Sequence, residues 1–353
     1  MMKSKKAKIL CVILVMSLAV AALPGCGNDS DGETVHHFNV SFANPEALVA
    51  PAVRALDRIQ ERSNGRITMT YYFAWSLSSP PTIIDDINAG MVHIGAIPIT
   101  EHTTRLPHLS TAAYVPMLGF PNMLEVGPLI DSVIADYPIF AEEFSRNDLV
   151  YITQWAMAPY HIWLAGDREI RTPSDFAGMR VVTSCRMLQA LISDNGGAPV
   201  TMPVTDYAIS LSTGVVDGAI MHVNIMRTQG ALDFIDSATI FADSGLTTAI
   251  QVFAFNDRAW NALSSDLQQL FLDEAEYIRD GIAQLLHSQE QSNMEWFEET
   301  GANITTLTPA ELDMWRELAH VFIEDELQIR YNDGATQVFE IFESVVRRTT
   351  AMR

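Results

Sequence analysis

The sequence has no lysine after residue 8. Of its 22 basic residues, four are lysines at positions 3, 5, 6 and 8, and the other 18 are arginines set against 43 acidic residues. Without its first 25 residues the chain therefore carries a net charge of −25. Proteins that bind nucleic acid or an anionic membrane by charge need a basic surface, so this composition argues against both partners.

Cysteine is almost as scarce, with residues only at positions 11, 26 and 185. The first two lie in or next to an N-terminal apolar segment, which leaves Cys185 without a partner for an internal disulfide. A single cysteine with no paired histidine motif is more typical of a small buried residue than of a nucleophile.

Catalytic and metal-binding motifs are also missing. The chain contains no G-x-S-x-G elbow, no phosphate-binding P-loop, no H-E-x-x-H and no C-x-x-C. Its nine histidines fit no zinc-ligand spacing. We therefore expect no cofactor, no metal and no enzymatic activity. A surface hydrolase is the least favoured alternative, because it would need a nucleophile within reach of a base.

The N-terminus has the pattern of an export signal. Four lysines precede an apolar run over residues 9–23, which is short for a membrane-spanning helix of about 20 residues. Leu23-Pro24-Gly25-Cys26 is similar to a lipobox, and a polar stretch follows it. We expect residues 1–25 to be a signal peptide, Cys26 to be lipidated, and residues 26–36 to form a tether to the membrane. An ordinary secretory signal with a chance cysteine is the alternative.

The remaining chain alternates between strand-like and helix-like patterns. Residues 38–42 and 67–71 alternate as strands do, and the intervening residues 45–63 have apolar positions at helical spacing. This alternation predicts an α/β fold rich in parallel strands, with ligands at the strand ends. About 320 residues exceed one simple core, which favours two domains.

Two capping boxes mark helices in the C-terminal third. Ser265-Asp266-Leu267-Gln268 predicts a helix that continues to about residue 298, roughly 50 Å at the rise of an α-helix. Thr308-Pro309-Ala310-Glu311 predicts the start of another.

The most specific pattern lies at residues 172–218. It begins with a one-turn helix start, T-P-S-D, and ends in S-T-G-V-V-D-G. Between them lie a glycine stop at Gly178, a short strand over 179–183, a helix over 187–194, the turn G-G-A-P-V and a helix over 205–211. This order resembles the solute-binding proteins of TRAP transporters, the DctP family, and the resemblance extends from about residue 38 to the C-terminus.

The resemblance implies a two-lobed fold like that of periplasmic binding proteins, with a long interdomain helix and hinge strands at 149–156 and 248–256. Lobe I would comprise residues 37–152 and 238–280, and lobe II residues 153–237 and 281–353. It also implies an extracytoplasmic, membrane-anchored receptor that closes on a small organic solute and delivers it to TRAP membrane permease subunits. A sensory lipoprotein that signals to a receptor kinase is the alternative.

The resemblance also indicates where a ligand would bind, and there the chain departs from its relatives. The arginine that usually grips the ligand carboxylate falls at Val182, and a second family arginine falls near His161 or Ile162. These replacements favour an organic acid or a less polar, aromatic solute over a small diacid. Arg180 and Arg186 are candidate substitutes, Met221 replaces a family asparagine with Asn224 one helical turn later, Trp75 stands where relatives often have glycine, and Trp155 and Asn44 complete the candidate site.

Overall fold

The computed structural model describes residues 34–113, 123–241, 245–318, 340–344 and 347, and within them the chain forms two mixed β-sheets. The predicted signal peptide and Cys26 lie outside the described residues. In strand order, the sheet of lobe I consists of β2 (Ile67–Tyr72), β1 (His36–Ser41), β3 (Ile94–Pro98), β10 (Ile250–Asn256) and β4 (Leu149–Ala156). The sheet of lobe II consists of β11 (Asn303–Thr306), β9 (Ser237–Ile240), β5 (Tyr160–Leu164), β8 (Gly218–His222), β6 (Arg180–Val182) and β7 (Ala198–Val200).

Helices cover both faces of the lobe I sheet and form two separate cores. On one face α1 and α10 bury apolar residues against Phe38, Val40 and Phe253. On the other face α2, α4 and α5 pack against residues such as Val252 and Ala254. The helices of this lobe are α1 (Glu46–Arg62), α2 (Ile83–Asn88), α3 (Pro107–Ser110), α4 (Met123–Asp136), α5 (Pro138–Arg146) and α9 (Asp257–Asn261), together with the short η1 (Ile99–Glu101).

Lobe II has one continuous core, which includes Trp163, Val182 and Phe297. The predicted order of short elements between Thr172 and Gly218 is confirmed, including the reciprocal capping bonds between Thr172 and Asp175. The helices are η3 (Pro173–Phe176), α6 (Arg186–Asp194), η4 (Val204–Asp206), α7 (Tyr207–Ser212), α8 (Val223–Thr228) and η5 (Leu232–Phe234).

The connections from β4 to β5 and from β9 to β10 pass between the lobes, and their described residues include 157–159 and 245–249. Strands β4 and β10 are neighbours in the lobe I sheet, and the segments that continue from their adjacent ends are joined by the hydrogen bond from Met157 N to Ala249 O, 2.7 Å. Residues 153–156 therefore belong to the sheet of lobe I and 238–240 to that of lobe II, a few residues from the predicted boundaries. Phe342 packs against Phe140 in lobe I, because this late apolar segment returns to the face covered by α5.

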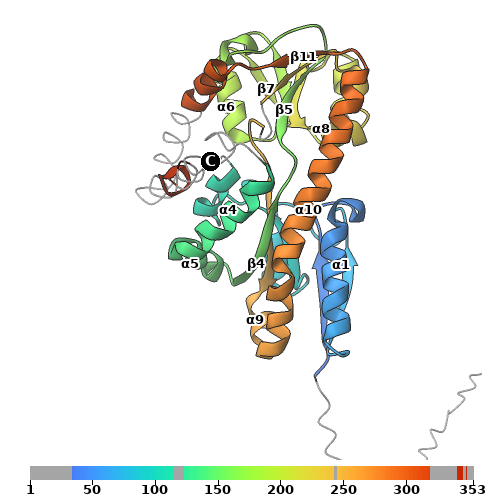
Figure 1. Ribbon diagram of the computed structural model, residues 1–353, viewed down its shortest axis with the longest axis vertical. Helices are drawn as coiled ribbons and strands as arrows, with labels where there is room; N and C mark the ends of the chain where they lie inside the picture. The colour runs from blue at the N-terminus through green and yellow to red at the C-terminus, as the bar shows by residue number, and fades with distance from the viewer. Residues whose placement is uncertain (1–33, 114–122, 242–244, 319–339, 345–346, 348–353) are drawn as a thin grey trace, which may run out of the picture. The chain divides into compact units, whose positions relative to one another are not determined.

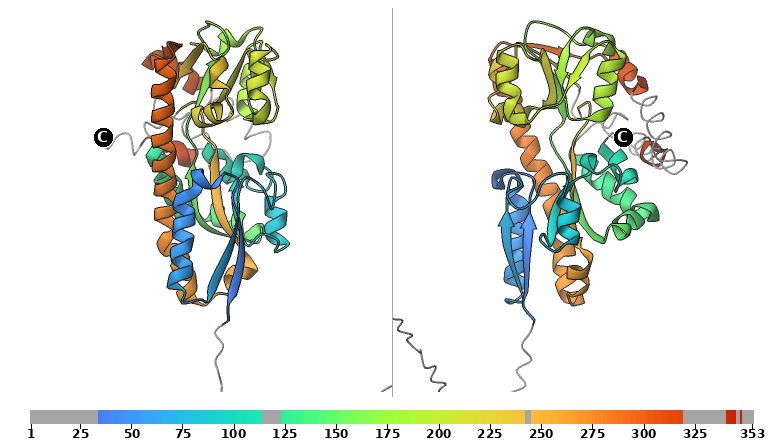
Figure 2. Two further views of the ribbon diagram at one scale, coloured as in Figure 1. Left: turned by 90° about the vertical axis from the view of Figure 1, so that its right-hand side faces the viewer. Right: turned by 180° about the vertical axis from the view of Figure 1, so that it is seen from behind.

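Helix α10 (Ser265–Glu299) runs past both lobes, as Figures 1 and 2 show. Its 35 residues extend for roughly 50 Å, so the predicted long interdomain helix is confirmed. The predicted capping box at Ser265 is wrong, because the N-cap of the helix is Ser264. The capping box at Thr308 is confirmed by reciprocal bonds with Glu311. Among the described residues, no helix is long and apolar enough to cross a membrane.

The glycine that ends the S-T-G-V-V-D-G pattern is required by close strand packing. Gly218 lies opposite Leu164 in the β5–β8 ladder. A Cβ atom on Gly218 would come within 2.6 Å of the Trp163 carbonyl oxygen and 2.8 Å of the Leu164 side chain. The backbone of β5 can move little, since both of its edges are paired.

We expect Gly218→Ala to lower the free energy of unfolding by about 1–3 kcal/mol, the usual cost of overpacking a filled core. Urea unfolding followed by circular dichroism measures this change. Val215→Ala is the control, because Val215 belongs to the same pattern but is 52% exposed. An equal loss in both variants would contradict the steric explanation.

Candidate functional site

The ends of the strands that could hold a ligand lie at facing edges of the two sheets. In lobe I, β1, β3 and β4 are parallel, so their carboxyl ends share one edge. In lobe II, β6 and β8 end at the edge where β5 begins with Tyr160. Burial raises the pKa of Tyr160 well above its ordinary value, with smaller contributions from Tyr207, Cys185 and Glu101. Because Glu101 follows β3 and the other two belong to lobe II, residues of both lobes approach each other around Tyr160.

Strand β6 places Val182 and Arg180 at opposite ends. Val182 is fully buried in the core of lobe II, so this side chain contributes no charge. Arg180 lies at the amino end of β6, away from the edge where the strand leads to α6. Its guanidinium binds Asp217 in a fork, with Nε 3.1 Å from Oδ2 and Nη2 2.9 Å from Oδ1. The side-chain hydrogen bond from Arg180 lowers the pKa of Asp217, and the arginine is already engaged by a carboxylate of the family pattern.

Arg186 stands at the carboxyl end of the same strand. It is the first residue of α6, is exposed, and makes no side-chain hydrogen bond or ion pair within the described part of the chain. The start of a helix carries a partial positive charge, which adds to the attraction of Arg186 for anions. The preceding Cys185 is the N-cap, and burial raises the pKa of its thiol to about 11. Cys185 is therefore protonated at neutral pH and is not a nucleophile.

The lobe I edge presents polar atoms without partners. Trp155 and Gln251 lie opposite each other in the β4–β10 ladder, so their side chains are on the same face of the sheet. The Trp155 Nε1 donor and the Gln251 Oε1 acceptor are both buried and have no hydrogen-bond partner in the described structure, and the same is true of Asn44 Oδ1 after β1. A buried polar group without a partner costs about 1–3 kcal/mol, so these atoms are suited to a bound molecule.

Trp75 packs beside the second core of lobe I. Its backbone has a φ of 61°, in the left-handed region that favours glycine. The side chain is partly buried, and its backbone N–H donates to the Phe42 carbonyl oxygen at 3.3 Å. Trp75 therefore lies near the end of β1, on the same lobe as Trp155.

The other candidate residues of lobe II are engaged within the protein. His161 and Met221 lie opposite each other in the β5–β8 ladder, and both are buried. His161 Nε2 lies 3.5 Å from Glu290 of α10. Asn224 is bound to the same helix: its amide donates to the Leu286 carbonyl oxygen at 3.3 Å, and its oxygen accepts from Asn293 at 2.8 Å. These side chains attach lobe II to α10 and leave Asn224 little free hydrogen-bonding capacity.

Sequence reasoning missed Gln251 and Glu290. Gln251 had a signal, since it is the one amide in the otherwise apolar run I-Q-V-F-A-F of β10. Glu290 had none, because its partner His161 lies 129 positions earlier in the chain. Among the described residues, no group of three or more His, Cys, Asp or Glu side chains could hold a metal ion.

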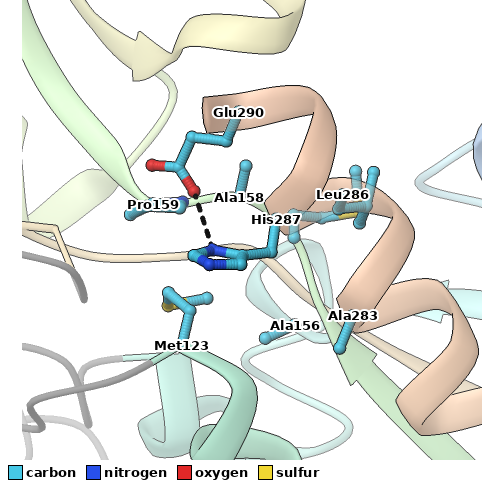
Figure 3. A pocket seen from close by; sticks show the side chains of 9 residues that line it. Met123, Ala156, Ala158, Pro159, Ala283, Leu286, His287 and Glu290 are labelled. Carbon is cyan, nitrogen blue, oxygen red and sulfur yellow. Dashed lines mark ion pairs between the residues drawn. The ribbon is translucent and has the colours of Figure 1, made fainter. Parts of the chain in front are cut away.

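A small cavity lies where α10 passes the segment 157–159 (Figure 3). Its volume is about 10 Å³, close to the minimum of about 10–15 Å³ for one water molecule. This cavity is too small for an organic solute. It is lined by Met123 of α4, residues 156–159, and Ala283, Leu286, His287 and Glu290 of α10.

The chain matches a family model over residues 45–327. That model is DctP, described as bacterial extracellular solute-binding protein, family 7. The chain belongs to this family. It is therefore an extracellular solute-binding protein.

Solved structures share its fold at low sequence identity. A TRAP periplasmic solute-binding protein from Desulfovibrio salexigens superposes with a TM-score of 0.77 at 17% identity, over 90% of this chain and 97% of the other. A marine metagenome TRAP protein specific for aromatic acids, bound to 3-hydroxybenzoate, has a TM-score of 0.76 at 19% identity, over 89% and 99%. An extracytoplasmic solute receptor from Bordetella pertussis that binds pyroglutamic acid has a TM-score of 0.70 at 16% identity, over 87% and 99%.

His222, at the lobe II edge, generates a prediction about pH. Its ring is buried beside Tyr160, and Nδ1 accepts the N–H of Ile225 as the N-cap of α8. Burial and the nearby His161 lower the pKa of His222 to about 4. The unfolded chain, with an ordinary histidine pKa of about 6.5, then binds more protons than the folded chain between these two values. Stability therefore falls as pH decreases from about 6.5 to about 4, by up to about 1.4 kcal/mol per pH unit from this group.

We expect His222→Asn to reduce that pH dependence, because asparagine keeps an N-cap acceptor but does not titrate. Urea unfolding at a series of pH values measures it. His37→Asn, an exposed histidine of β1, should leave the slope as in the wild type. An unchanged slope in His222→Asn would assign the dependence to other groups.

Proposed function

We propose that this protein is the extracytoplasmic solute-binding component of a TRAP-type secondary transporter, and that its ligand is a small organic acid with one carboxylate and an apolar or aromatic body. The two lobes close on the ligand and present it to the membrane permease subunits. Closure is a shift between open and closed populations, in which contacts made with both lobes favour the closed form. No covalent step is involved.

The observation that carries this proposal is the unpaired guanidinium of Arg186 at the carboxyl end of β6. Arg180 is already held by Asp217, and Val182 offers only an apolar surface. Among the described residues, Arg186 is thus a cation near this edge that is available for a ligand carboxylate, and a planar guanidinium binds carboxylate as a two-pronged donor. A single arginine is better suited to a ligand with one carboxylate than to a ligand with two carboxylates.

The lobe I edge supports an aromatic or weakly polar body for the ligand. Trp155 offers an indole N–H, and Gln251 and Asn44 offer amide oxygens, which suit a hydroxyl or amide group on the ligand. The relatives with the same fold that are described above bind 3-hydroxybenzoate and pyroglutamic acid, each of which carries a single carboxylate. This agreement supports an organic monoacid, and we propose aromatic monoacids as the first class to examine.

Titration of two arginine variants tests the assignment. With 3-hydroxybenzoate as the probe, we expect Arg186→Ala to weaken binding about 10- to 100-fold, since a hydrogen bond to a charged group contributes about 1.5–3 kcal/mol. Isothermal titration calorimetry measures the affinity, and Arg180→Ala is the matched control that should bind as the wild type does. Succinate should bind more weakly than 3-hydroxybenzoate. If Arg180→Ala abolishes binding while Arg186→Ala does not, the carboxylate clamp lies at Arg180 instead.

We also propose that Cys26 is the mature N-terminus and carries a lipid that anchors the protein to the membrane. The lysine-rich start, the apolar run and the Gly25-Cys26 junction support this. Mass spectrometry of the protein from its native membrane should find a diacylglyceryl group on Cys26, and Cys26→Ser should release the protein into the soluble fraction. An unmodified N-terminus downstream of residue 26 would refute the anchor.

A further inference from the structure

A buried donor and a buried acceptor lie side by side at the edge of the lobe I sheet. Trp155 of β4 and Gln251 of β10 are directly opposite each other in the antiparallel ladder. Each lies one residue inside the strand end that adjoins a connection to lobe II. Trp155 is fully buried, and Gln251 is 6% exposed. The pair therefore occupies the last rungs of the sheet before the chain crosses between the lobes.

Each of the two side chains has a polar atom without a partner. The Trp155 Nε1 donor and the Gln251 Oε1 acceptor are enclosed, and neither makes a hydrogen bond in the described structure. Residues directly opposite in a ladder have Cβ atoms about 4.5–5.5 Å apart, yet the indole N–H does not donate to the amide oxygen. Their positions do not allow a direct hydrogen bond, so a third group between them is needed to satisfy both atoms.

The immediate surroundings supply no such group. The Trp155 ring lies 5.9 Å from that of Phe253, which stacks on Phe42 at 5.6 Å. On its other side Gln251 is opposite Pro98 of β3, which has neither an N–H nor a polar side chain. A buried polar atom without a partner costs about 1–3 kcal/mol, and an apolar residue at position 251 would avoid this cost. The two atoms are therefore suited to a molecule that enters from outside.

The chemistry of the pair restricts what can bridge it. The bridging group must accept a hydrogen bond from Trp155 Nε1 and donate one to Gln251 Oε1. A hydroxyl does both with one oxygen, and an amide presents a C=O and an N–H side by side. An ether accepts but cannot donate. An ionised carboxylate also only accepts, and it would place a negative charge against the Gln251 oxygen.

We propose that Trp155 and Gln251 select ligands whose body carries a neutral group that both accepts and donates, a hydroxyl or an amide. This inference rests on the proposed function, in which lobe II binds the carboxylate. A site built to form hydrogen bonds with a substrate group rejects the analogue that lacks it, because the polar atoms of the site then stay unpaired. The same pair disfavours a second carboxylate at this end of the ligand.

Three matched acids test the selection in the wild-type protein. Isothermal titration calorimetry compares 3-hydroxybenzoate, 3-methoxybenzoate and benzoate, which differ only in the group at one ring position. We expect 3-hydroxybenzoate to bind about 10- to 100-fold more tightly than benzoate, because benzoate leaves a buried donor and acceptor unpaired. The methoxy oxygen can accept from Trp155 but cannot donate to Gln251, so 3-methoxybenzoate should also bind about 10-fold more weakly than 3-hydroxybenzoate.

Variants assign the preference to the two residues. Gln251→Met and Trp155→Phe should each bring the affinity ratio of 3-hydroxybenzoate to benzoate close to one. The ratio is the readout because a general loss of packing weakens both acids alike. Gln154→Met is the matched control: Gln154 is the neighbouring residue of β4 on the other face of the sheet, where its amide donates to the Gly127 carbonyl oxygen at 2.7 Å. Its Oε1 also lacks a partner, and the variant should keep the wild-type ratio.

A second pair of acids separates this inference from the proposed ligand class. Pyroglutamate carries a lactam N–H and C=O, and cyclopentanecarboxylate is its apolar match. If the aromatic acids do not bind but pyroglutamate is preferred, and Gln251→Met removes the preference, the inference stands and the aromatic body is wrong.

The selection is overturned if the wild type binds both members of a pair equally. It is also overturned if Gln251→Met keeps the preference, since a water molecule alone would then bridge the two atoms. If no acid of either pair binds, the monoacid proposal fails and this inference fails with it.

Discussion

The attachment of one helix to both lobes is the constraint on which the geometry of this receptor depends. In the described part of the chain the two sheets share no strand, and α10 packs against α1, α4 and β4 of lobe I and against α8 of lobe II. Leu286 marks the transition, because its side chain belongs to a core of lobe I while its carbonyl oxygen accepts a hydrogen bond from lobe II. A solute that draws the lobes together must therefore supply enough binding free energy to bend this helix as well as to displace water from the space between the lobes.

The facing edges of the lobes divide the chemistry of recognition between them. On lobe II the side chains of Val181 and Val182 in β6 are apolar and belong to the core. An arginine at position 182 would bury a guanidinium, which would need a partner there. The positive charge lies instead at the start of α6. On lobe I the edge holds the unpaired indole and amide atoms of Trp155 and Gln251. The charged group of a ligand would thus contact lobe II and its weakly polar body would contact lobe I. Both parts of the ligand are bound together only when the lobes close.

Local sequence patterns predicted most of the helices and strands, but they could not predict which distant segments pair with one another. The T-P-S-D start, the short strands and the long helix near residue 265 follow from turn residues and periodicity, and the resemblance they carry predicted the two-lobed fold. The place of β10 between β3 and β4 and the return of Phe342 to lobe I depend on packing between distant segments. The Arg180–Asp217 and His161–Glu290 contacts likewise join residues 37 and 129 positions apart. The engagement of Arg180 and Asn224 within the protein therefore became visible only in three dimensions.

The central position of β10 has a consequence for how the chain acquires its structure. Strands β3 and β4 do not pair with each other, since β10 lies between them and bonds to both. The sheet of lobe I is thus incomplete until residues 250–256 have been synthesised, by which time every strand of lobe II except β11 is available. Such pairings between distant segments form slowly. The N-terminal half of the chain therefore cannot complete the lobe I sheet alone, and the edges of β3 and β4 that pair with β10 remain open until β10 is made.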